Sequence, residues 1–414
     1  MNKKKILITA YAFNPMSSLQ LHPEEDIFGW KLVEQIGSMF DVWVLTHSSN
    51  REDVLEALSR GEMPGVNIHF LELPGFYWKL NKTEWGQRLY YYFWQKAARK
   101  KALELHQEID FDLAHNLTLG QDWSASFIGA NLPVPFVWGP VGGGQRVPKG
   151  LTGESSLSGR FAENIRRITQ WLARHLPARR KCIRKAKMIL VCSQEVKEKI
   201  PKRYRKKVRY FPAHGIDKED IRVKPVRMRK QKTFRVTTVG QIERTEGFSL
   251  AVEAFHKFAA DNLKADMTIV GKGPERERIE SLIIELGLAD KVTIQDWMKR
   301  EELFRKIKLS DVFLFTNFSD KGAAIVVDAM ACGLPIICMA AGGAGFHVKE
   351  KWGVKIQPKN REYVIDEMAK ALSRLNKNEK LRAEMGEAAR KRAKEYYEWT
   401  KLGKRMMELY AQIM

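Results

Sequence analysis

Short apolar runs alternate with segments of helical periodicity along the first half of the chain. Residues 27–36 carry apolar side chains three and four positions apart, which predicts a helix. The runs that suit buried strands lie at residues 6–12, 42–46, 66–71, 111–116, 134–138 and 188–192. Repeated alternation of strands and helices is typical of a parallel sheet that is covered by helices.

The same alternation begins again in the second half. Between residues 201 and 232 the chain is dense in Lys and Arg, contains three prolines and lacks helical periodicity, so we expect a linker there. Beyond it, strands are predicted at 234–239, 266–270, 292–294, 312–316 and 335–339, and helices at 247–260, 275–286, 301–310 and 323–332, with a long helical segment at the end. The sequence therefore predicts an α/β fold with two doubly wound parallel-sheet domains. Ligands of such sheets bind at the carboxyl ends of the strands.

The composition indicates a soluble globular protein. Of the 414 residues, 44% are hydrophobic and 29% are charged, and no apolar run approaches the roughly 18–20 residues that a membrane span needs. The first residues run directly into a predicted strand, so we expect no signal peptide. The four cysteines lack the spacing of a zinc site, which favours buried thiols in a reducing cytoplasm.

A positive charge of +22, from 71 Lys and Arg against 49 Asp and Glu, favours an anionic partner. Residues 76–101 and 160–187 interleave aromatic and basic side chains, and the second segment has helical spacing. This pattern suits the surface of an anionic membrane, and it also suits a solvated helix whose aromatic residues belong to the core. Single-stranded nucleic acid is the third candidate, but no nucleic-acid-binding motif supports it.

Two carboxylates bracket the start of a helix that is predicted to begin near Gly322. Asp320 lies in the preceding loop, and Asp328 follows two turns into the helix, with seven residues between them. A carboxylate can accept two hydroxyl donors, as the hydroxyls of ribose or a sugar require. The free N–H groups of Gly322, Ala323 and Ala324 would face an anion such as a diphosphate. The alternative is that Asp320 only caps the helix and Asp328 is a solvated side chain.

Residues 320–335 form a longer motif, Asp-Lys-Gly-Ala-Ala-Ile-Val-Val-Asp-Ala-Met-Ala-Cys-Gly-Leu-Pro. The motif resembles the donor-site signature of retaining GT-B glycosyltransferases of family four (glycosyl transferases group 1). In that signature two acidic residues, with seven residues between them, precede Ala-Met-Ala-x-Gly-x-Pro. Further segments that resemble the family lie at 138–144, 211–217, 239–240, 270–276 and 310–314.

This resemblance spans nearly the whole chain and implies the GT-B fold, in which two Rossmann-like domains face a cleft. The implied boundaries are an acceptor-side domain at 1–212, a linker at 213–232 and a nucleotide-sugar-binding domain at 233–390. The last segment, 391–414, is implied to contain a helix that crosses back to the first domain.

The resemblance also implies roles for the acidic motif. Asp328 would bind the nucleotide ribose, Asp320 would contact the transferred sugar in the catalytic centre, and the diphosphate would lie at Gly322, Ala323 and Ala324. The nucleotide-sugar is a substrate, and neither a cofactor nor a metal is implied, because helix N-termini and cations neutralise the leaving diphosphate.

The loop after the first strand of the second domain departs from the family pattern. Gln241 stands where the family has an Arg that binds the diphosphate, and Glu246 stands where it has a Lys. Charge-assisted hydrogen bonds contribute about 1.5–3 kcal/mol each, so diphosphate binding should be weaker. Gly240 is retained, and Arg244 and Lys272 are the candidate replacements.

Two further positions depart from the family. Residues 23–30 resemble a loop that normally has two glycines, but only Gly29 remains, which weakens the expectation of close backbone approach to phosphate. His214 stands where the family commonly has Asn, and we expect it to be a turn residue beside the linker.

The acceptor side is expected in the first domain. The family often has a His near the position of His115, so His115 is a candidate catalytic residue and Asn116 a candidate acceptor contact. A lone His at a strand end also suits a structural role. Gly142 and Gly143 are further acceptor-side candidates.

The sequence thus predicts retaining transfer of a sugar from a nucleotide-sugar to a glycan, a lipid-linked molecule or another acceptor, as in polysaccharide biosynthesis. We expect a cytoplasmic protein that binds peripherally at the inner face of the membrane. The alternative, which Gln241 and Glu246 motivate, is a non-catalytic GT-B scaffold that binds a partner through a degenerate donor site.

Overall fold

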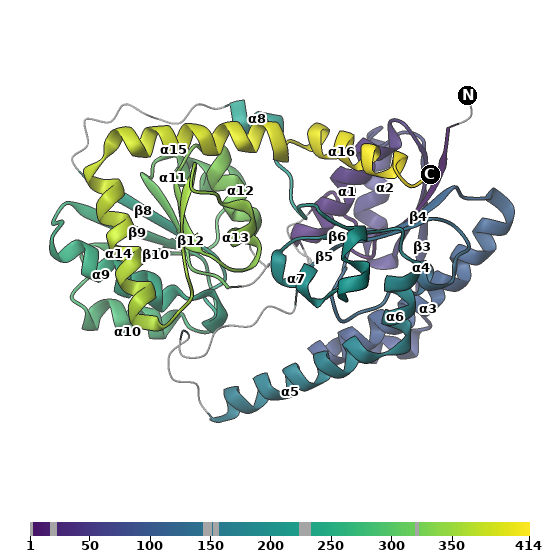
Figure 1. Cartoon of the computed structure of the whole chain (residues 1–414), viewed down its shortest axis with the longest axis horizontal. Coiled ribbons are helices and arrows are strands. Elements are labelled where there is room, and N and C mark those ends of the chain that lie inside the picture. Colours follow the sequence, from purple (N-terminus) through teal and green to yellow (C-terminus); the bar gives the residue numbers. More distant parts are fainter. Residues whose placement is uncertain (1–2, 17–22, 144–150, 152–156, 223–232, 319–322) are drawn as a thin grey trace.

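Two parallel sheets organise the chain in its computed structural model (Figure 1). The structure describes residues 3–16, 23–143, 151, 157–222, 233–318 and 323–414. Helices cover both faces of each sheet, so the central strands are buried along their whole length. This arrangement confirms the predicted α/β fold with two parallel-sheet domains.

The first sheet has seven strands in the order β3-β2-β1-β4-β5-β6-β7. Its strands are β1 (Lys5–Thr9), β2 (Asp41–His47), β3 (Val66–Leu71), β4 (Leu113–Asn116), β5 (Phe136–Val141), β6 (Met188–Val191) and β7 (Val208–Tyr210). The helices of this half are α1 (Pro23–Gly37), η1 (Ser48–Asn50), α2 (Arg51–Ser59), η2 (Gly75–Lys82), α3 (Glu84–Ile109), α4 (Phe127–Asn131), α5 (Leu157–His175), α6 (Pro177–Lys185), α7 (Gln194–Lys199) and η3 (Lys202–Lys207).

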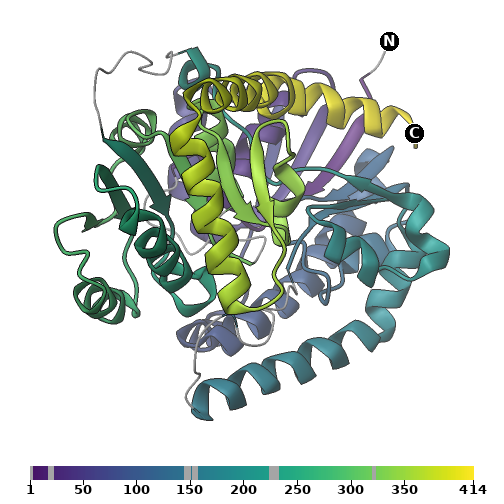
Figure 2. The ribbon, with the colours of Figure 1, turned by 60° about the vertical axis from the view of Figure 1, so that its left-hand side comes forward.

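The second sheet has six strands in the order β10-β9-β8-β11-β12-β13. Its strands are β8 (Phe234–Val239), β9 (Ala265–Val270), β10 (Val292–Gln295), β11 (Val312–Phe315), β12 (Ile336–Met339) and β13 (Gly353–Ile356). The helices are α8 (Lys218–Arg222), η4 (Arg244–Glu246), α9 (Phe248–Ala260), α10 (Arg276–Glu285), α11 (Arg300–Lys308), α12 (Ala323–Ala331), α13 (Gly342–His347), α14 (Arg361–Lys377), α15 (Glu379–Arg392), η5 (Ala393–Tyr397) and α16 (Trp399–Ala411). Figure 2 shows α14 along one face of this sheet.

The end of the chain returns to the first domain. Figure 1 shows α15 along the second domain and α16 on the first. Trp399 and Tyr410 of α16 are part of the same buried apolar cluster as Phe28 of α1. A Cβ atom added to Gly403 would lie 2.4 Å from Cβ of Gln35, so the absence of a side chain allows the close approach of α16 to α1.

Further contacts join the two halves, among them the following. Leu151, from the first half of the sequence, packs in the core of the second domain, and its carbonyl accepts a hydrogen bond from Arg361. Glu195, at the start of α7, accepts a hydrogen bond of 2.9 Å from the backbone N–H of Gly342. Because α7 follows β6 and α13 follows β12, this bond brings the carboxyl edges of the two sheets together.

The segment that was expected to be a linker is more ordered than its composition indicates. Between residues 201 and 232 the structure contains η3, β7 and α8. The three-residue β7 is too short to produce a recognisable apolar run, and its three residues are the edge of the sheet. The domain boundaries themselves stay predictions.

The structure bears on the cysteines and on membrane-spanning helices. All four cysteines are free and buried. Within the described ranges, no helix combines the length and apolar character that crossing a bilayer requires.

Candidate functional site

The candidate site lies at the carboxyl edge of the second sheet, where the loops after β8 and β9 pack backbone against backbone. The N–H of Ile242 donates to the carbonyl of Lys272 over 3.0 Å, and the N–H of Gly240 donates to Val270 over 3.1 Å. A Cβ atom on Gly271 would lie only 1.9 Å from the carbonyl oxygen of Gly240, so a side chain is excluded there. This packing places the predicted diphosphate-binding residues of both loops side by side.

The loop after β8 is also fixed to the end of β11. Gly247 has the left-handed conformation, with φ of 74°, where the chain turns into α9. The hydroxyl of Thr316 donates to the carbonyl of Glu246 over 2.7 Å. The three loops therefore form one unit at this edge.

Asp328 occupies the second turn of α12, with a side chain that is 8% exposed. Arg300, the first residue of α11, donates from Nη1 to Oδ2 over 2.9 Å and from Nη2 to Oδ1 over 2.8 Å. Nη2 also donates to Asp220 of α8 over 3.1 Å, and the guanidinium lies over the ring of Phe304. Two carboxylates from two helices thus share one guanidinium, and the paired geometry fixes the direction of the Asp328 side chain.

Burial and the neighbouring charges act in opposite directions on the pKa values of this cluster. Burial raises the pKa of Asp328, while the positive charge of Arg300 acts in the opposite direction. Burial also works against the charge of Arg300, but Asp328 and Asp220 outweigh it and raise the pKa of Arg300. The guanidinium therefore stays protonated and places a positive charge beside Asp328.

His214 connects this cluster to the first domain. Burial lowers its pKa to about 4, against the opposing fields of Asp328 and Glu25, so the ring is neutral near pH 7. Its Nε2 lies 3.7 Å from a carboxylate oxygen of Glu24. His214 is therefore more than a turn residue: it lies between the start of α1 and the buried carboxylate of α12.

The start of α1 is acidic. Glu25 accepts a hydrogen bond of 2.7 Å from the N–H of Leu119, in the loop after β4. Burial, reinforced by the charge of Glu25, raises the pKa of Asp26 to about 7, against a backbone hydrogen bond from Phe13. Gly29 is buried here, and a Cβ atom on it would lie 2.6 Å from the carbonyl oxygen of Ala12. In this structure the glycine therefore serves the packing of α1 against the turn after β1.

The two residues at the expected cation positions, Gln241 and Glu246, and the two candidate replacement cations, Arg244 and Lys272, differ in their exposure. Gln241 and Lys272 are exposed, whereas Arg244 and Glu246 are partly buried. An oxygen of the Glu246 carboxylate would lie 3.2 Å from a Cβ atom on Gly240. A negative charge therefore stands beside the glycine at the predicted diphosphate position.

Only part of the acidic motif lies within the described residues. Asp320 and Gly322 fall outside them. Ala323 is buried at the start of α12 and Ala324 is partly buried, one turn before Asp328. The predicted juxtaposition of Asp320 and Asp328 stays a prediction.

His115 lies inside the first domain. Its Nδ1 is 2.6 Å from the hydroxyl of Tyr410, and its Nε2 faces the carbonyl of Gly139. Burial lowers its pKa to about 4, so the neutral ring donates from Nε2 to the carbonyl, and Nδ1 accepts from Tyr410. Both ring nitrogens are therefore occupied within the protein, which gives His115 the structural role of joining β4 to α16.

Asn116 is also held internally. It is buried, donates to the carbonyl of Thr118 over 3.0 Å and accepts from Gln95 over 3.4 Å. Its position at the end of β4 is as predicted, but its side chain serves the loop that follows.

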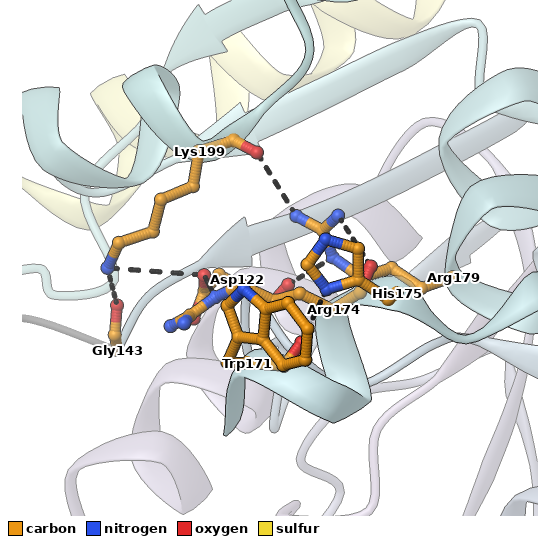
Figure 3. Close-up of polar contacts among 7 residues, drawn as sticks. All are labelled: Asp122, Gly143, Trp171, Arg174, His175, Arg179 and Lys199. Atoms are coloured by element: carbon orange, nitrogen blue, oxygen red, sulfur yellow. Dashed lines mark hydrogen bonds and ion pairs between the residues drawn. The ribbon is translucent and has the colours of Figure 1, made fainter. Parts of the chain in front are cut away.

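Gly142 and Gly143 lie at the carboxyl edge of the first sheet, against the loop that follows β4. The N–H of Gly142 donates to the carbonyl of Gly120 over 2.8 Å. The carbonyl of Gly143 accepts from Lys199, and a Cβ atom on Gly143 would lie 2.8 Å from the ring of Trp123. Figure 3 shows Gly143 beside the polar contacts that surround the buried Asp122. These two glycines lie at the carboxyl edge of the first sheet, and their acceptor-side role stays a prediction.

Among the described residues, no cluster of three or more His, Cys, Asp or Glu side chains could hold a metal ion. The sequence indicated Asp328 but gave no sign of Arg300 or of the position of His214. Arg300 is 28 residues from Asp328 in the sequence, and only the fold brings them together.

Comparison with known proteins supports the assignment of the second domain. Residues 217–392 match the family model described as glycosyl transferases group 1. Over 257 residues the chain is 22% identical to the alpha-D-kanosaminyltransferase of Streptomyces kanamyceticus. This match covers 59% of this chain and 64% of that protein. The matches span less than two thirds of the length of the first curated relatives.

The fold is shared with solved glycosyltransferase structures over nearly the whole chain. The sucrose-phosphate synthase of Thermosynechococcus elongatus is 18% identical, with a TM-score of 0.66 and coverage of 99% of each chain. Anabaena Alr3699/HepE in complex with UDP is 14% identical, with a TM-score of 0.61 and coverage of 99% of this chain and 100% of that one. The fold is therefore GT-B.

Proposed function

We propose that the chain is a glycosyltransferase that moves a sugar from a nucleotide-sugar donor to an acceptor held between its two domains. The observation that carries the proposal is the buried carboxylate of Asp328, held in one orientation by Arg300 at the carboxyl edge of the second sheet. The family match of residues 217–392 and the glycosyltransferases among the relatives support the same activity.

The pairing with Arg300 is compatible with a role of Asp328 in ribose binding. An ionised carboxylate has about four lone-pair sites, and the two bonds from Arg300 use one site on each oxygen. One site on each oxygen remains for the two ribose hydroxyls. In this proposal Arg300 is a positioning residue that orients Asp328, and its positive charge opposes the rise in the pKa of Asp328 that burial causes.

The diphosphate is proposed to lie at the start of α12, against Ala323 and Ala324, with Arg244 and Lys272 as the nearby cations. The N-terminal N–H groups of a helix favour an anion at this place. Asp320 and Gly322 are assigned to the sugar and the diphosphate from the family motif alone. We further propose that transfer retains the configuration, as the motif implies, and depends on stabilisation of the leaving group instead of a protein nucleophile.

The acceptor is proposed to be a glycan or a lipid-linked molecule that contacts the first domain at Gly142 and Gly143, in a protein that works in the cytoplasm. His115 is left out of the proposed catalytic centre because both of its ring nitrogens are bonded inside the domain.

A specific observation favours a second candidate, a GT-B scaffold without catalysis. The Glu246 carboxylate lies beside Gly240, Gln241 carries no charge, and the start of α1 is acidic. Each feature disfavours a diphosphate. A scaffold that binds a partner through the same cleft would retain the fold without needing these cations.

A thermal-shift panel separates the two candidates. The full chain is heated with uridine, guanosine, adenosine, cytidine and thymidine diphosphates and their common sugar conjugates. An enzyme is stabilised in proportion to the logarithm of ligand concentration by at least one of them, because the ligand binds only the folded state. The absence of any shift across the panel would favour the scaffold.

A further inference from the structure

The long helix α5 is oriented opposite to a typical surface helix of a globular protein. Among its side chains that the structure describes, Gln170 is buried and Arg167 and Arg174 are partly buried, so the polar face is turned toward the protein. The apolar face is turned outward. We define the α5 surface as four exposed apolar side chains of this face and that of the residue after the helix, which are Ile165 (39% exposed), Ile168 (58%), Trp171 (55%), Leu172 (53%) and Leu176 (53%).

A buried ion pair fixes this orientation. Asp122, which is fully buried, accepts hydrogen bonds from Nε and Nη2 of Arg174 over 2.6 and 3.2 Å. Arg179 of α6 donates to the backbone carbonyl of Asp122 and to that of Lys199 (Figure 3). A rotation of α5 that buried its apolar face would remove both hydrogen bonds of the buried carboxylate to Arg174 and leave it only the longer ion pair with Lys199, at 4.0 Å, which is unfavourable. The α5 surface is therefore held outward by the fold.

The surroundings of the α5 surface are positively charged. The following helix, α6, contacts α5 and exposes four cations, Arg180, Lys181, Arg184 and Lys185. The chain as a whole carries a net charge of +22. In Figures 1 and 2, α5 lies at the margin of the molecule, away from both sheets, so a large flat partner can reach it.

From these features we infer that the α5 surface, together with the cations of α6, docks onto a lipid bilayer that contains anionic lipids. The apolar side chains of an interfacial helix enter the boundary between headgroups and acyl chains, tryptophan favours that boundary, and basic residues pair with anionic headgroups. A second copy of the chain is a poorer fit, because it would bring two positively charged α6 helices together. This inference does not depend on the proposed sugar transfer.

Sedimentation with lipid vesicles tests the inference on the full chain. The probes are vesicles of phosphatidylcholine alone and vesicles of phosphatidylcholine with phosphatidylglycerol. The wild type should sediment only with the anionic vesicles, and added NaCl should weaken the binding. Failure to sediment at low salt, or equal binding to both vesicles, would overturn the inference.

Two variants assign the binding to this surface. Ile168→Asn combined with Leu172→Asn should lower the partition coefficient by about tenfold or more, because two apolar side chains no longer enter the bilayer. Leu263→Asn combined with Ile284→Asn makes the same change at two exposed positions of the second domain and should bind as the wild type does. Equal losses in both double variants would overturn the inference.

Analytical ultracentrifugation without lipid distinguishes self-association. The wild type and the Ile168→Asn, Leu172→Asn variant should sediment at the same rate, as expected if the surface is not an interface between copies. A wild-type dimer that the double substitution dissociates would overturn the bilayer assignment.

Discussion

The guanidinium of Arg300 donates one hydrogen bond to each carboxylate oxygen of Asp328, and this pair joins the start of α11 to the second turn of α12. The same guanidinium donates to Asp220 of α8, the helix that follows β7, the last strand of the first sheet. The pair therefore connects the proposed ribose-binding carboxylate to the segment between the domains.

Arg300→Ala tests how far the buried carboxylate depends on its partner. Loss of both bonds leaves Asp328 buried without a cation, and the free energy of unfolding should fall by about 1–3 kcal/mol. The deficit should shrink toward acidic pH, because the folded variant binds a proton on Asp328 that the unfolded chain releases more readily.

Urea unfolding at about pH 5.5 and about pH 8.5 measures both effects. The control is Arg305→Ala, an exposed position on the same helix, which should change stability little. Equal stability of the wild type and Arg300→Ala at both pH values would show that the pair does not hold the site.

Gln241→Arg and Glu246→Lys restore the cations that the family motif has. Each new charge-assisted hydrogen bond to a diphosphate contributes about 1.5–3 kcal/mol, so each substitution should raise affinity for a nucleoside diphosphate by roughly tenfold or more. Titration calorimetry measures the affinity. Glu243→Lys makes the same charge change as Glu246→Lys at an exposed position of the loop and should have a smaller effect. If all three variants gain the same affinity, the gain comes from the net charge of the protein alone, and the proposed diphosphate position is wrong.

Much of the fold could be predicted because its strands are local features. The strand at 234–239 is bounded as predicted, since five of its six residues are buried and the last four form a continuous β-branched run. The missed strands lack this signal. β7 has only three residues, and β13 begins with Gly353 and carries Lys355, so neither forms an apolar run.

The candidate site divides in the same way. Asp328 lies in a contiguous motif and could be found from the sequence. Arg300 could not, because its role depends on a partner 28 residues away in the sequence. The same holds for His115, because the residue that occupies its Nδ1 is Tyr410, 295 residues later, on the helix that returns to the first domain.

Asp26→Asn tests the acidic start of α1. The pKa of Asp26 is raised to about 7 from an ordinary value of 3.8, so the folded wild type binds a proton more tightly than the unfolded chain. Wild-type stability attributable to this group is therefore lost as pH rises from about 4 to about 7. The variant lacks this loss and should be more stable above pH 7, by about 1–3 kcal/mol, with a smaller advantage in acid.

Unfolding curves across this pH range provide the measurement. Asp261→Asn makes the same change at an exposed position and should show no such pH dependence relative to the wild type. A stability advantage of Asp26→Asn that grew toward acidic pH would contradict the assignment of a buried carboxyl group with a raised pKa.

Tyr410→Phe tests the structural role of His115. The variant leaves Nδ1 of a buried imidazole without its donor, which should lower the free energy of unfolding by about 1–3 kcal/mol. The turnover of any sugar transfer, measured well below the unfolding temperature, should be unchanged. Tyr92→Phe, at a half-exposed position, is the control. A loss of turnover without a loss of stability would return His115 to the catalytic centre.

The central claim is that Asp328 accepts the ribose hydroxyls of a nucleotide, and 2′-deoxy nucleotides test it most directly. Calorimetry compares each nucleoside diphosphate with its 2′-deoxy form, on the wild type, on Asp328→Asn and on Asp366→Asn, a surface carboxylate paired with Lys257. We predict that the wild type and Asp366→Asn bind the ribonucleotide about tenfold more tightly than the deoxy form. Asp328→Asn should bind weakly and without this preference. A preference for ribose that survives in Asp328→Asn would contradict the account.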